Sequence, residues 1–241
     1  MKKSYIIIGV VVVVMLAAIG IYAVINSNSQ SKKQLEENST NIEGTTNTEN
    51  SAKKNKDENI QNNQISNESE ENNMYSTGKH HAEIVVKNYG TIALELDSDV
   101  APITVENFAN LVNEGFYNGL TFHRIISGFM IQGGDPLGNG TGGSSKTIKG
   151  EFASNGVKNS ISHVRGTISM ARSSMPNSAS SQFFIVHQDS TFLDGKYAAF
   201  GTVTSGMEVV DKICADTAVE DDNGTVAKNN QPVIEKITII D

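Results

Sequence analysis

Apolar and polar residues alternate with a period of two along most of the chain from His80 onward. Residues 82–86 and 92–96 alternate on either side of a turn at 88–90, which predicts two strands joined in a β-hairpin. Alternation or short apolar runs predict further strands, and a break at Ser127-Gly128 divides the first of these segments in two: 122–132, 166–171, 181–187, 198–203 and 233–240. The count is roughly eight short strands.

Two segments show the helical period instead. Pro102 stands where a helix can begin, apolar residues recur at helical spacing after it, and Gly115 is a stop signal. A second short helix is predicted over Met207–Cys214. The expected fold class is therefore mainly β, a closed eight-stranded antiparallel barrel with two α-helices, because closure leaves no unpaired strand edge.

The amino-terminal stretch Ile6–Ile25 carries no charge and nothing more polar than glycine or Tyr22. At about 1.5 Å per residue in a helix it would reach about 30 Å, enough to cross a bilayer. We therefore expect residues 1–25 to be an uncleaved transmembrane anchor. A cleaved signal peptide followed by secretion is the alternative, although Ala23 lacks the small residue two positions earlier that a cleavage site usually has.

The charges that flank this stretch predict its orientation. Lys2 and Lys3 lie closer to it than Lys32 and Lys33 do. Because cytoplasmic flanks carry the excess of positive charge, this favours an amino terminus inside the cell and the remainder outside. The expected location is the cell membrane, crossed once, with an extracytoplasmic carboxyl-terminal domain.

The composition changes sharply after the anchor. Residues 26–78 are rich in Asn, Ser, Glu, Gln and Lys, and their few apolar residues follow no period. Such a segment cannot bury enough apolar surface to offset the entropy lost on ordering. We expect a disordered linker at 26–78 and a folded domain at 79–241.

Composition also excludes some partners and sites. The net charge is −8, and no segment forms a basic stripe, so nucleic acid is not expected as a partner. Cys214 is the only cysteine, which excludes an intramolecular disulfide and a thiolate zinc cluster, and its helical spacing predicts a packed core thiol. The five histidines show no ligand spacing, so no metal site and no cofactor are expected.

The segment Phe122–Asp135 places one cation, Arg124, among apolar and aromatic neighbours. In a regular strand, Phe122, Arg124 and Ile126 would share one face. An arginine on an apolar face either reaches past its neighbours to water or borders a cleft. The segment by itself leaves both interpretations open.

The sequence names no nucleophile for covalent catalysis. There is no G-x-S-x-G elbow and no G-K-[ST] phosphate loop. Gly138, Gly140 and Gly143 match the dinucleotide pattern G-x-G-x-x-G, but no apolar helix follows them, so we reject that match. Ser, His and Asp are numerous enough to leave a triad open, yet no motif selects one.

Several longer motifs occur in order along the chain. They are Phe122-His123-Arg124, Gly128-Phe129-Met130-Ile131-Gln132-Gly133-Gly134-Asp135, Gly140-Thr141-Gly142-Gly143, Ser169-Met170-Ala171, Ser181-Gln182-Phe183-Phe184-Ile185 and Leu193-Asp194-Gly195-Lys196. With these motifs the chain resembles the cyclophilin family of peptidyl-prolyl isomerases over essentially all of residues 80–241. The resemblance implies an eight-stranded antiparallel barrel capped by two helices.

The resemblance also implies a mechanism. An X-Pro amide rotates over a barrier of about 18–20 kcal/mol that amide resonance sets. By resemblance Arg124 is the catalytic residue, which would donate a hydrogen bond to the prolyl nitrogen as it pyramidalises. The candidate substrate-binding residues are Phe129, Met130, Gln132, Thr141, Ala171, Arg172, Ser173, Gln182, Phe184, Phe192, Leu193 and Tyr197.

Within this set the resemblance assigns roles. The residues that would grip the proline ring are Phe129, Met130, Phe184 and Leu193. Gln132 and Gln182 would bind peptide backbone, and the backbone around Ala171–Ser173 would hold the residue before proline. The other interpretation of the aromatic residues is plain barrel core. Because Phe183 and Phe184 are adjacent in a strand and face opposite ways, only one can line a pocket, and the resemblance selects Phe184.

The chain departs from many eukaryotic members at two positions of the motif. Phe192 stands where they have Trp, and Tyr197 stands where they often have His. Phenylalanine keeps an apolar wall but has no indole N–H to donate, so we expect cyclosporin binding to be weak. The Arg172-Ser173 loop, one residue longer than the common form, resembles bacterial members.

The expected function is therefore peptidyl-prolyl cis-trans isomerisation in extracytoplasmic proteins, in assistance of their folding. The expected partners are proline-containing peptides, unfolded or folding proteins, and the membrane through the amino-terminal helix. The alternative is a cyclophilin-fold module that binds proline-containing partners with little turnover.

Overall fold

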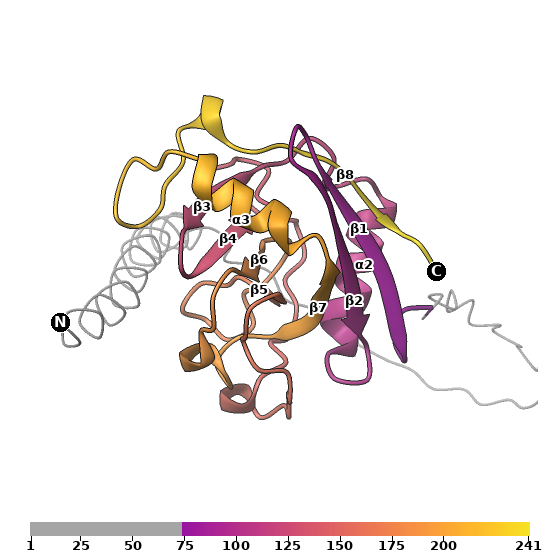
Figure 1. The fold of residues 1–241 in the computed structure, drawn as a ribbon. Helices are drawn as coiled ribbons and strands as arrows, with labels where there is room; N and C mark the ends of the chain where they lie inside the picture. The colour runs from indigo at the N-terminus through magenta and orange to yellow at the C-terminus, as the bar shows by residue number, and fades with distance from the viewer. Residues whose placement is uncertain (1–73) are drawn as a thin grey trace, which may run out of the picture. The chain divides into compact units, whose positions relative to one another are not determined.

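The computed structural model describes residues 74–241, in which one eight-stranded sheet packs with two α-helices (Figure 1). This confirms a mainly β fold with two helices. The strands are β1 (Lys79–Val86), β2 (Gly90–Asp97), β3 (Phe122–Ile126), β4 (Met130–Gly133), β5 (Thr167–Met170), β6 (Phe183–Val186), β7 (Ala199–Ser205) and β8 (Ile234–Ile239). The helices are α2 (Pro102–Asn113) and α3 (Met207–Asp216), and three 3-10 turns are η1 (Ala153–Asn155), η2 (Thr191–Leu193) and η3 (Lys228–Asn230).

β1 and β2 form the hairpin that the alternating pattern predicts. Val86 pairs with Gly90 at its tip, and Asn88 in the turn has a φ of 67°. Asparagine adopts this left-handed conformation at smaller cost than most residues, which explains its place in a tight turn. Alternate residues of both strands are buried, so one face of the hairpin contributes to the core.

The sheet curls, but its regular pairing does not close. The strand order is β3-β4-β6-β5-β7-β2-β1-β8, so β3 and β8 are its edges. An isolated bridge between Thr121 and Val233, with flanking backbone hydrogen bonds, joins the two edges. Residues 224–226 cover the outer edge of β3 instead, where the amide of Ile125 donates to the carbonyl of Gly224. The expected closed barrel is therefore corrected to a curled sheet.

Both helices occupy the segments that the sequence predicts. α2 begins at Pro102, where the missing N–H costs no helical hydrogen bond, and Gly115 follows its end with a φ of 70°. α3 ends at Asp216, slightly beyond the predicted limit at Cys214. Figure 1 shows the two helices on separate sides of the curled sheet.

The main hydrophobic core joins the two helices to the sheet. Aromatic rings from α2, β3 and β6 meet in it. Phe183 lies edge-on to Phe108 at 5.7 Å and to Phe122 at 6.1 Å between ring centroids. Cys214 is half-buried against this core, and burial raises the pKa of its thiol to about 11. The thiol is therefore protonated at neutral pH.

Tyr75 belongs to this core although it lies in the segment expected to be a linker. Its ring is buried, and its carbonyl accepts a hydrogen bond of 2.6 Å from the hydroxyl of Ser98. Its own hydroxyl accepts one of 2.9 Å from the amide of Asn113 at the end of α2. Residues just before β1 thus pack against the folded domain.

The expected anchor at 1–25, and most of the expected linker at 26–78, lie outside the described residues. Within residues 74–241 no helix combines the length and the apolar character needed to cross a membrane. The anchor and the orientation across the membrane remain predictions.

Candidate functional site

A β-bulge in β3 decides which way Arg124 points. Phe122 pairs with Gly133 of β4, and Arg124 pairs with the adjacent residue Gln132. His123 lies between them without a partner, so it is an extra residue in the strand. Phe122 consequently lies fully buried in the main core, whereas Arg124 is half-buried and contacts Met130 outside that core. The prediction that Phe122 and Arg124 share a face is wrong because the bulge reverses the alternation.

Neutral groups hold the guanidinium of Arg124. Its Nε donates to the carbonyl oxygen of Asn223 at 2.8 Å, its Nη2 donates to Oδ1 of Asn223 at 3.2 Å, and its Nη1 donates to Oε1 of Gln132 at 3.2 Å. None of the ion pairs among residues 74–241 includes it. Burial lowers the pKa of Arg124, but an arginine begins so far above neutrality that the group stays charged.

A second apolar cluster lies beside Arg124 and is separate from the main core. We call it the Met130 cluster. Its buried members are Met130, Phe184, Val186 and Leu193, and its partly buried members are Ile126, Phe129, Ala171 and Tyr197. Phe183 lies in the main core and its neighbour Phe184 in the Met130 cluster, which confirms that the two rings face opposite ways. Of the predicted site residues, six come together here.

Two glutamine amides connect Arg124 to the glycine-rich loop at residues 133–143. Gln132 accepts from Arg124 and donates through Nε2 to Oε1 of Gln182 at 2.8 Å. Gln182 in turn donates through Nε2 to the carbonyl oxygen of Gly142 at 2.7 Å. Each amide therefore has a fixed orientation, since one end accepts and the other donates.

Phe192 and Tyr197 form the rim of the Met130 cluster. Phe192 is 53% exposed, and its ring centroid lies 5.6 Å from that of Phe129. The Tyr197 ring stands edge-on to Phe184 at 5.9 Å. An exposed aromatic ring next to a cluster of apolar side chains extends the apolar surface that a ligand can contact.

The remaining predicted residues lie on loops and bond mainly within them. Thr141 is exposed and its hydroxyl donates to Oδ1 of Asn139 at 2.7 Å. The hydroxyls of Ser173 and Ser178 bond to each other at 2.8 Å. Arg172 turns its guanidinium toward the rings of Tyr197 and Phe152. The structure therefore brings Arg172 to the rim of the cluster, but shows Thr141 and Ser173 in local turns.

The family model of cyclophilin type peptidyl-prolyl cis-trans isomerases matches residues 81–240. The chain belongs to this family. A peptidyl-prolyl cis-trans isomerase of Helicobacter pylori is 51% identical over 128 residues, which cover 52% of this chain and 76% of the relative. Peptidyl-prolyl cis-trans isomerase B of Bacillus subtilis is 50% identical over 117 residues, covering 48% and 78%.

The fold of this cyclophilin is similar to that of solved members. A cyclophilin type isomerase of Cryptosporidium parvum, solved in the presence of the dipeptide Ala-Pro, has a TM-score of 0.59 and 32% sequence identity. The match covers 67% of this chain and 99% of that one. Family and relatives together identify this chain as an enzyme, a cyclophilin-type peptidyl-prolyl cis-trans isomerase.

The cyclophilin also contains an Asp–His–Ser arrangement that sequence inspection did not select. Nδ1 of His163 lies 2.8 Å from Oδ1 of Asp194, and Nε2 lies 3.0 Å from Oγ of Ser169. Ser169 has no exposed surface, so it cannot serve as a nucleophile for a substrate in solution. The ring of His163 stacks on that of Phe184, with 6.0 Å between the centroids and 17° between the planes. The arrangement therefore positions a ring of the Met130 cluster.

The protonation of this triad follows from its surroundings. Burial lowers the pKa of His163 and outweighs the opposing effect of Asp194. Burial acts to raise the pKa of Asp194, but hydrogen bonds from Ser162 and His163 leave it below its usual value. A neutral imidazole next to a carboxylate keeps its proton on Nδ1, so Nε2 accepts from Ser169. Asp194 belongs to the Leu193-Asp194-Gly195-Lys196 motif, but nothing in the sequence pattern links that motif to His163.

Asn223 is the second residue that sequence inspection missed. It lies on the loop before residues 224–226, almost a hundred positions from Arg124, and makes two of its hydrogen bonds. The carboxylate of Asp221 orders this loop by accepting from the amide and the hydroxyl of Thr225 at 3.0 and 2.9 Å. An Asp-rich surface loop gives no sequence pattern that would link it to β3.

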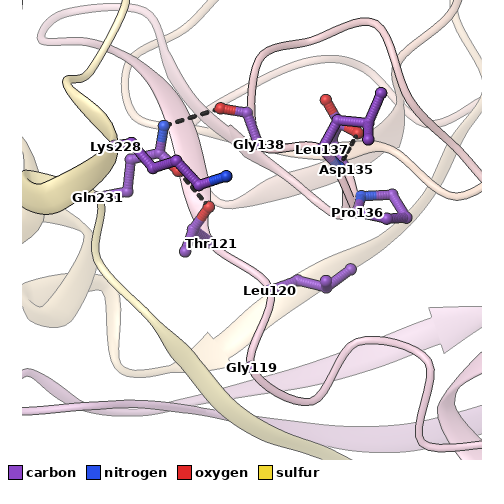
Figure 2. Close-up of a pocket in the computed structure, with 9 residues that line it drawn as sticks. All are labelled: Gly119, Leu120, Thr121, Asp135, Pro136, Leu137, Gly138, Lys228 and Gln231. Carbon is purple, nitrogen blue, oxygen red and sulfur yellow. Dashed lines mark hydrogen bonds between the residues drawn. The ribbon is translucent and has the colours of Figure 1, made fainter.

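The cavity in Figure 2 lies on another part of the cyclophilin and is not lined by Arg124. It has a volume of about 130 Å³. Gln231 joins its walls, since Oε1 accepts from Thr121 at 2.5 Å and Nε2 donates to the carbonyl of Gly138 at 2.8 Å. None of the predicted site residues lines it, so we interpret it as a gap beneath the glycine-rich loop.

The histidines of the described domain form no metal site. His123 and His163 are buried, and among residues 74–241 no group of three or more His, Cys, Asp and Glu could hold a metal ion.

Proposed function

We propose that this cyclophilin accelerates the rotation of X-Pro bonds in extracytoplasmic proteins and so assists their folding. The observation that supports the site is the contact of a charged guanidinium with an apolar cluster: Nη1 of Arg124 lies 3.9 Å from the sulfur of Met130. A proline ring is apolar and its nitrogen is the atom that changes during rotation. A site for the reaction therefore needs this combination of groups.

In the proposed mechanism the Met130 cluster holds the ring and Arg124 acts on the nitrogen. Amide resonance sets the barrier of about 18–20 kcal/mol, because the planar C–N bond has partial double-bond character. When the bond twists, the nitrogen pyramidalises and gains a lone pair that can accept a hydrogen bond. A guanidinium N–H aimed at that lone pair stabilises the twisted state more than either planar state, which lowers the barrier.

The remaining groups would position the peptide. Gln132 fixes Arg124 and stands at the edge of the cluster, and Gln182 fixes Gln132. We propose that the backbone of Ala171–Ser173 receives the residue before proline and that Phe192 and Tyr197 cover the ring. The Ala-Pro dipeptide named for the C. parvum structure supports a dipeptide-sized site in this family.

The enzymatic test is a rate of prolyl isomerisation for the full-length chain in detergent on an Ala-Pro peptide. We expect isomerisation to be much faster than the uncatalysed reaction, which takes about tens to hundreds of seconds. If the protein binds the peptide but leaves the rate unchanged, it is the alternative binding module. Refolding of a secreted protein whose slow phase is a prolyl isomerisation tests folding assistance, and an unaltered slow phase would argue against it.

The proposed location rests on the sequence of residues 1–25. We propose a single span with the isomerase domain outside the cell, and a cleaved, secreted form is the competing possibility. Protease added to intact cells should remove the domain and leave a short membrane-bound fragment. Full protection from protease would contradict the orientation, and a domain found only in the medium would favour cleavage.

A further inference from the structure

The side chain of Arg172 is fixed at the rim of the Met130 cluster. Its guanidinium carbon lies 4.8 Å from the centroid of the Tyr197 ring and 4.9 Å from that of Phe152. Nε and Nη2 donate to the carbonyl of Lys196 at 3.0 and 2.8 Å, and Nη1 donates to the carbonyl of Ser173 at 2.9 Å. Arginine normally loses considerable rotamer freedom on binding, but here that cost is already met in the folded protein.

None of the ion pairs within residues 74–241 includes Arg172. Its guanidinium donates to carbonyl oxygens and lies over aromatic rings instead. The contrast is Arg165, which pairs with both carboxylate oxygens of Asp211 at 2.7 and 2.8 Å. Asp194, two positions before Lys196, is already engaged by His163 and Ser162.

Two more cations beside the cluster, Arg124 and Lys196, also donate their hydrogen bonds to neutral groups. Arg124 is held by Asn223 and Gln132 rather than by an acid, and the amine of Lys196 donates to the carbonyl of Phe192 at 3.0 Å. The apolar cluster is therefore bordered by three cationic side chains whose hydrogen bonds go to neutral groups. These cations stand in a chain whose net charge is −8, so they differ in sign from the chain as a whole.

We propose that the site selects peptides that carry a carboxylate side chain next to the proline, and that Arg172 is the main residue that sets this preference. Ala171, directly before Arg172, packs against the Met130 cluster, and Tyr197 contacts both Phe184 and Arg172. A peptide whose proline sits on the cluster thus places its neighbouring residue close to Arg172. The inference rests on the proposed function of the cluster.

The expected size of the preference follows from Coulomb's law. Opposite charges about 8 Å apart at a surface, in a medium between water and protein, interact strongly enough to change affinity by about three- to tenfold. Added salt should weaken the preference, because the screening length falls from about 10 Å at 0.1 M to about 3 Å at 1 M. A preference that came from shape would not respond to salt.

The test compares kcat/KM of the full-length enzyme on peptides that differ only next to the proline: Glu-Pro against Gln-Pro, Pro-Glu against Pro-Gln, and Ala-Pro as reference. We expect the Glu peptide of at least one pair to be favoured by about three- to tenfold at low salt. Arg172→Gln should bring this ratio close to one, whereas Arg172→Lys should keep most of it because the charge remains. The ratio is measured within each variant, so a general loss of activity cancels.

The matched control is Lys212→Gln, which removes one positive charge from α3, where the amine lies over the ring of Tyr89. This control should leave the Glu-to-Gln ratio unchanged. If Ala-Pro is turned over but both Glu-to-Gln ratios equal one in the wild type, the preference is refuted while the isomerase function stands. If Lys212→Gln lowers the ratio as much as Arg172→Gln does, Arg172 is not the selecting residue. Absence of turnover on every peptide, Ala-Pro included, would instead refute the proposed function.

Discussion

Arg124 and Gln132 face each other across the ladder between β3 and β4, and a hydrogen bond of 3.2 Å from Nη1 to Oε1 joins them. Gln132 can accept this bond in one orientation only, because its Nε2 donates to Gln182. The position of the guanidinium therefore depends on a chain of amides as well as on Asn223. The hydrogen-bond partners of Arg124 are neutral and carry no negative charge to cancel its own, which leaves the charge available to a ligand.

The first prediction concerns Arg124 itself. Arg124→Ala should lower kcat/KM on an Ala-Pro peptide by more than tenfold while the urea unfolding midpoint changes little, since the side chain is only half-buried. Arg124→Lys should also lose most of the activity, because one ammonium group cannot keep the bonds to Asn223 and Gln132 together. Lys236→Ala, an exposed cation on β8, is the control. Near-normal activity of Arg124→Ala would remove Arg124 from its proposed role.

The second prediction uses two adjacent phenylalanines that face opposite sides of β6. Phe183→Ala should destabilise the domain by about 3–5 kcal/mol, because it leaves a cavity among the rings of the main core. Phe184→Ala should cost less stability and more kcat/KM, since its ring belongs to the Met130 cluster at the proposed site. Urea unfolding and peptide isomerisation on both variants provide the comparison. A folded Phe183→Ala protein with the greater loss of activity would contradict the assignment.

The sequence predicted the features that depend on local pattern. The hairpin, both helices and the opposite faces of Phe183 and Phe184 follow from alternation, helical spacing and turn residues. The bulge at His123 does not, because an extra residue in a strand shows only when its partner strand is known. The same limit hid Asn223 and His163, which act on Arg124 and Phe184 from distant parts of the chain.

The barrel closure and the place of Tyr75 show a second limit. Closure depends on which segment pairs with the outer edge of β3. Residues 224–226 pair with it through backbone hydrogen bonds, which leave no side-chain pattern in the sequence. Tyr75 stands alone in a polar segment, and a single aromatic residue has no period. Its burial is decided by the surface that Ser98 and Asn113 present to it.

The third prediction follows from the pKa of His163. Burial lowers this pKa in the folded state below the ordinary value of about 6.5, so the unfolded chain binds more protons as the pH falls through that value. The free energy of unfolding should therefore fall as the pH decreases below about 6.5, by at most about 1.4 kcal/mol per pH unit for one group. Urea unfolding between pH 7.5 and pH 5 measures this slope.

The variant His163→Gln tests the origin of the slope. It should lose stability at neutral pH, because its amide cannot stack on Phe184 as a ring does, but its pH slope should be smaller than that of the wild type. His123 is also buried, and its pKa is lowered by the same cause, so His123→Gln should remove a further part of the slope. An unchanged slope in His163→Gln would show that the imidazole is not the group that titrates.

The last prediction concerns the rim residue Phe192. Its ring is 53% exposed and lies next to Phe129, so a larger aromatic side chain can replace it without entering the core. Phe192→Trp adds an N–H donor that phenylalanine lacks, and one hydrogen bond of about 1–1.5 kcal/mol corresponds to roughly a tenfold change in affinity. We expect cyclosporin to bind the wild type weakly and Phe192→Trp roughly tenfold more tightly. Phe192→Leu keeps an apolar wall without a donor, so it should not gain affinity; equal tightening in both variants would show that apolar contact, rather than the indole donor, limits cyclosporin binding.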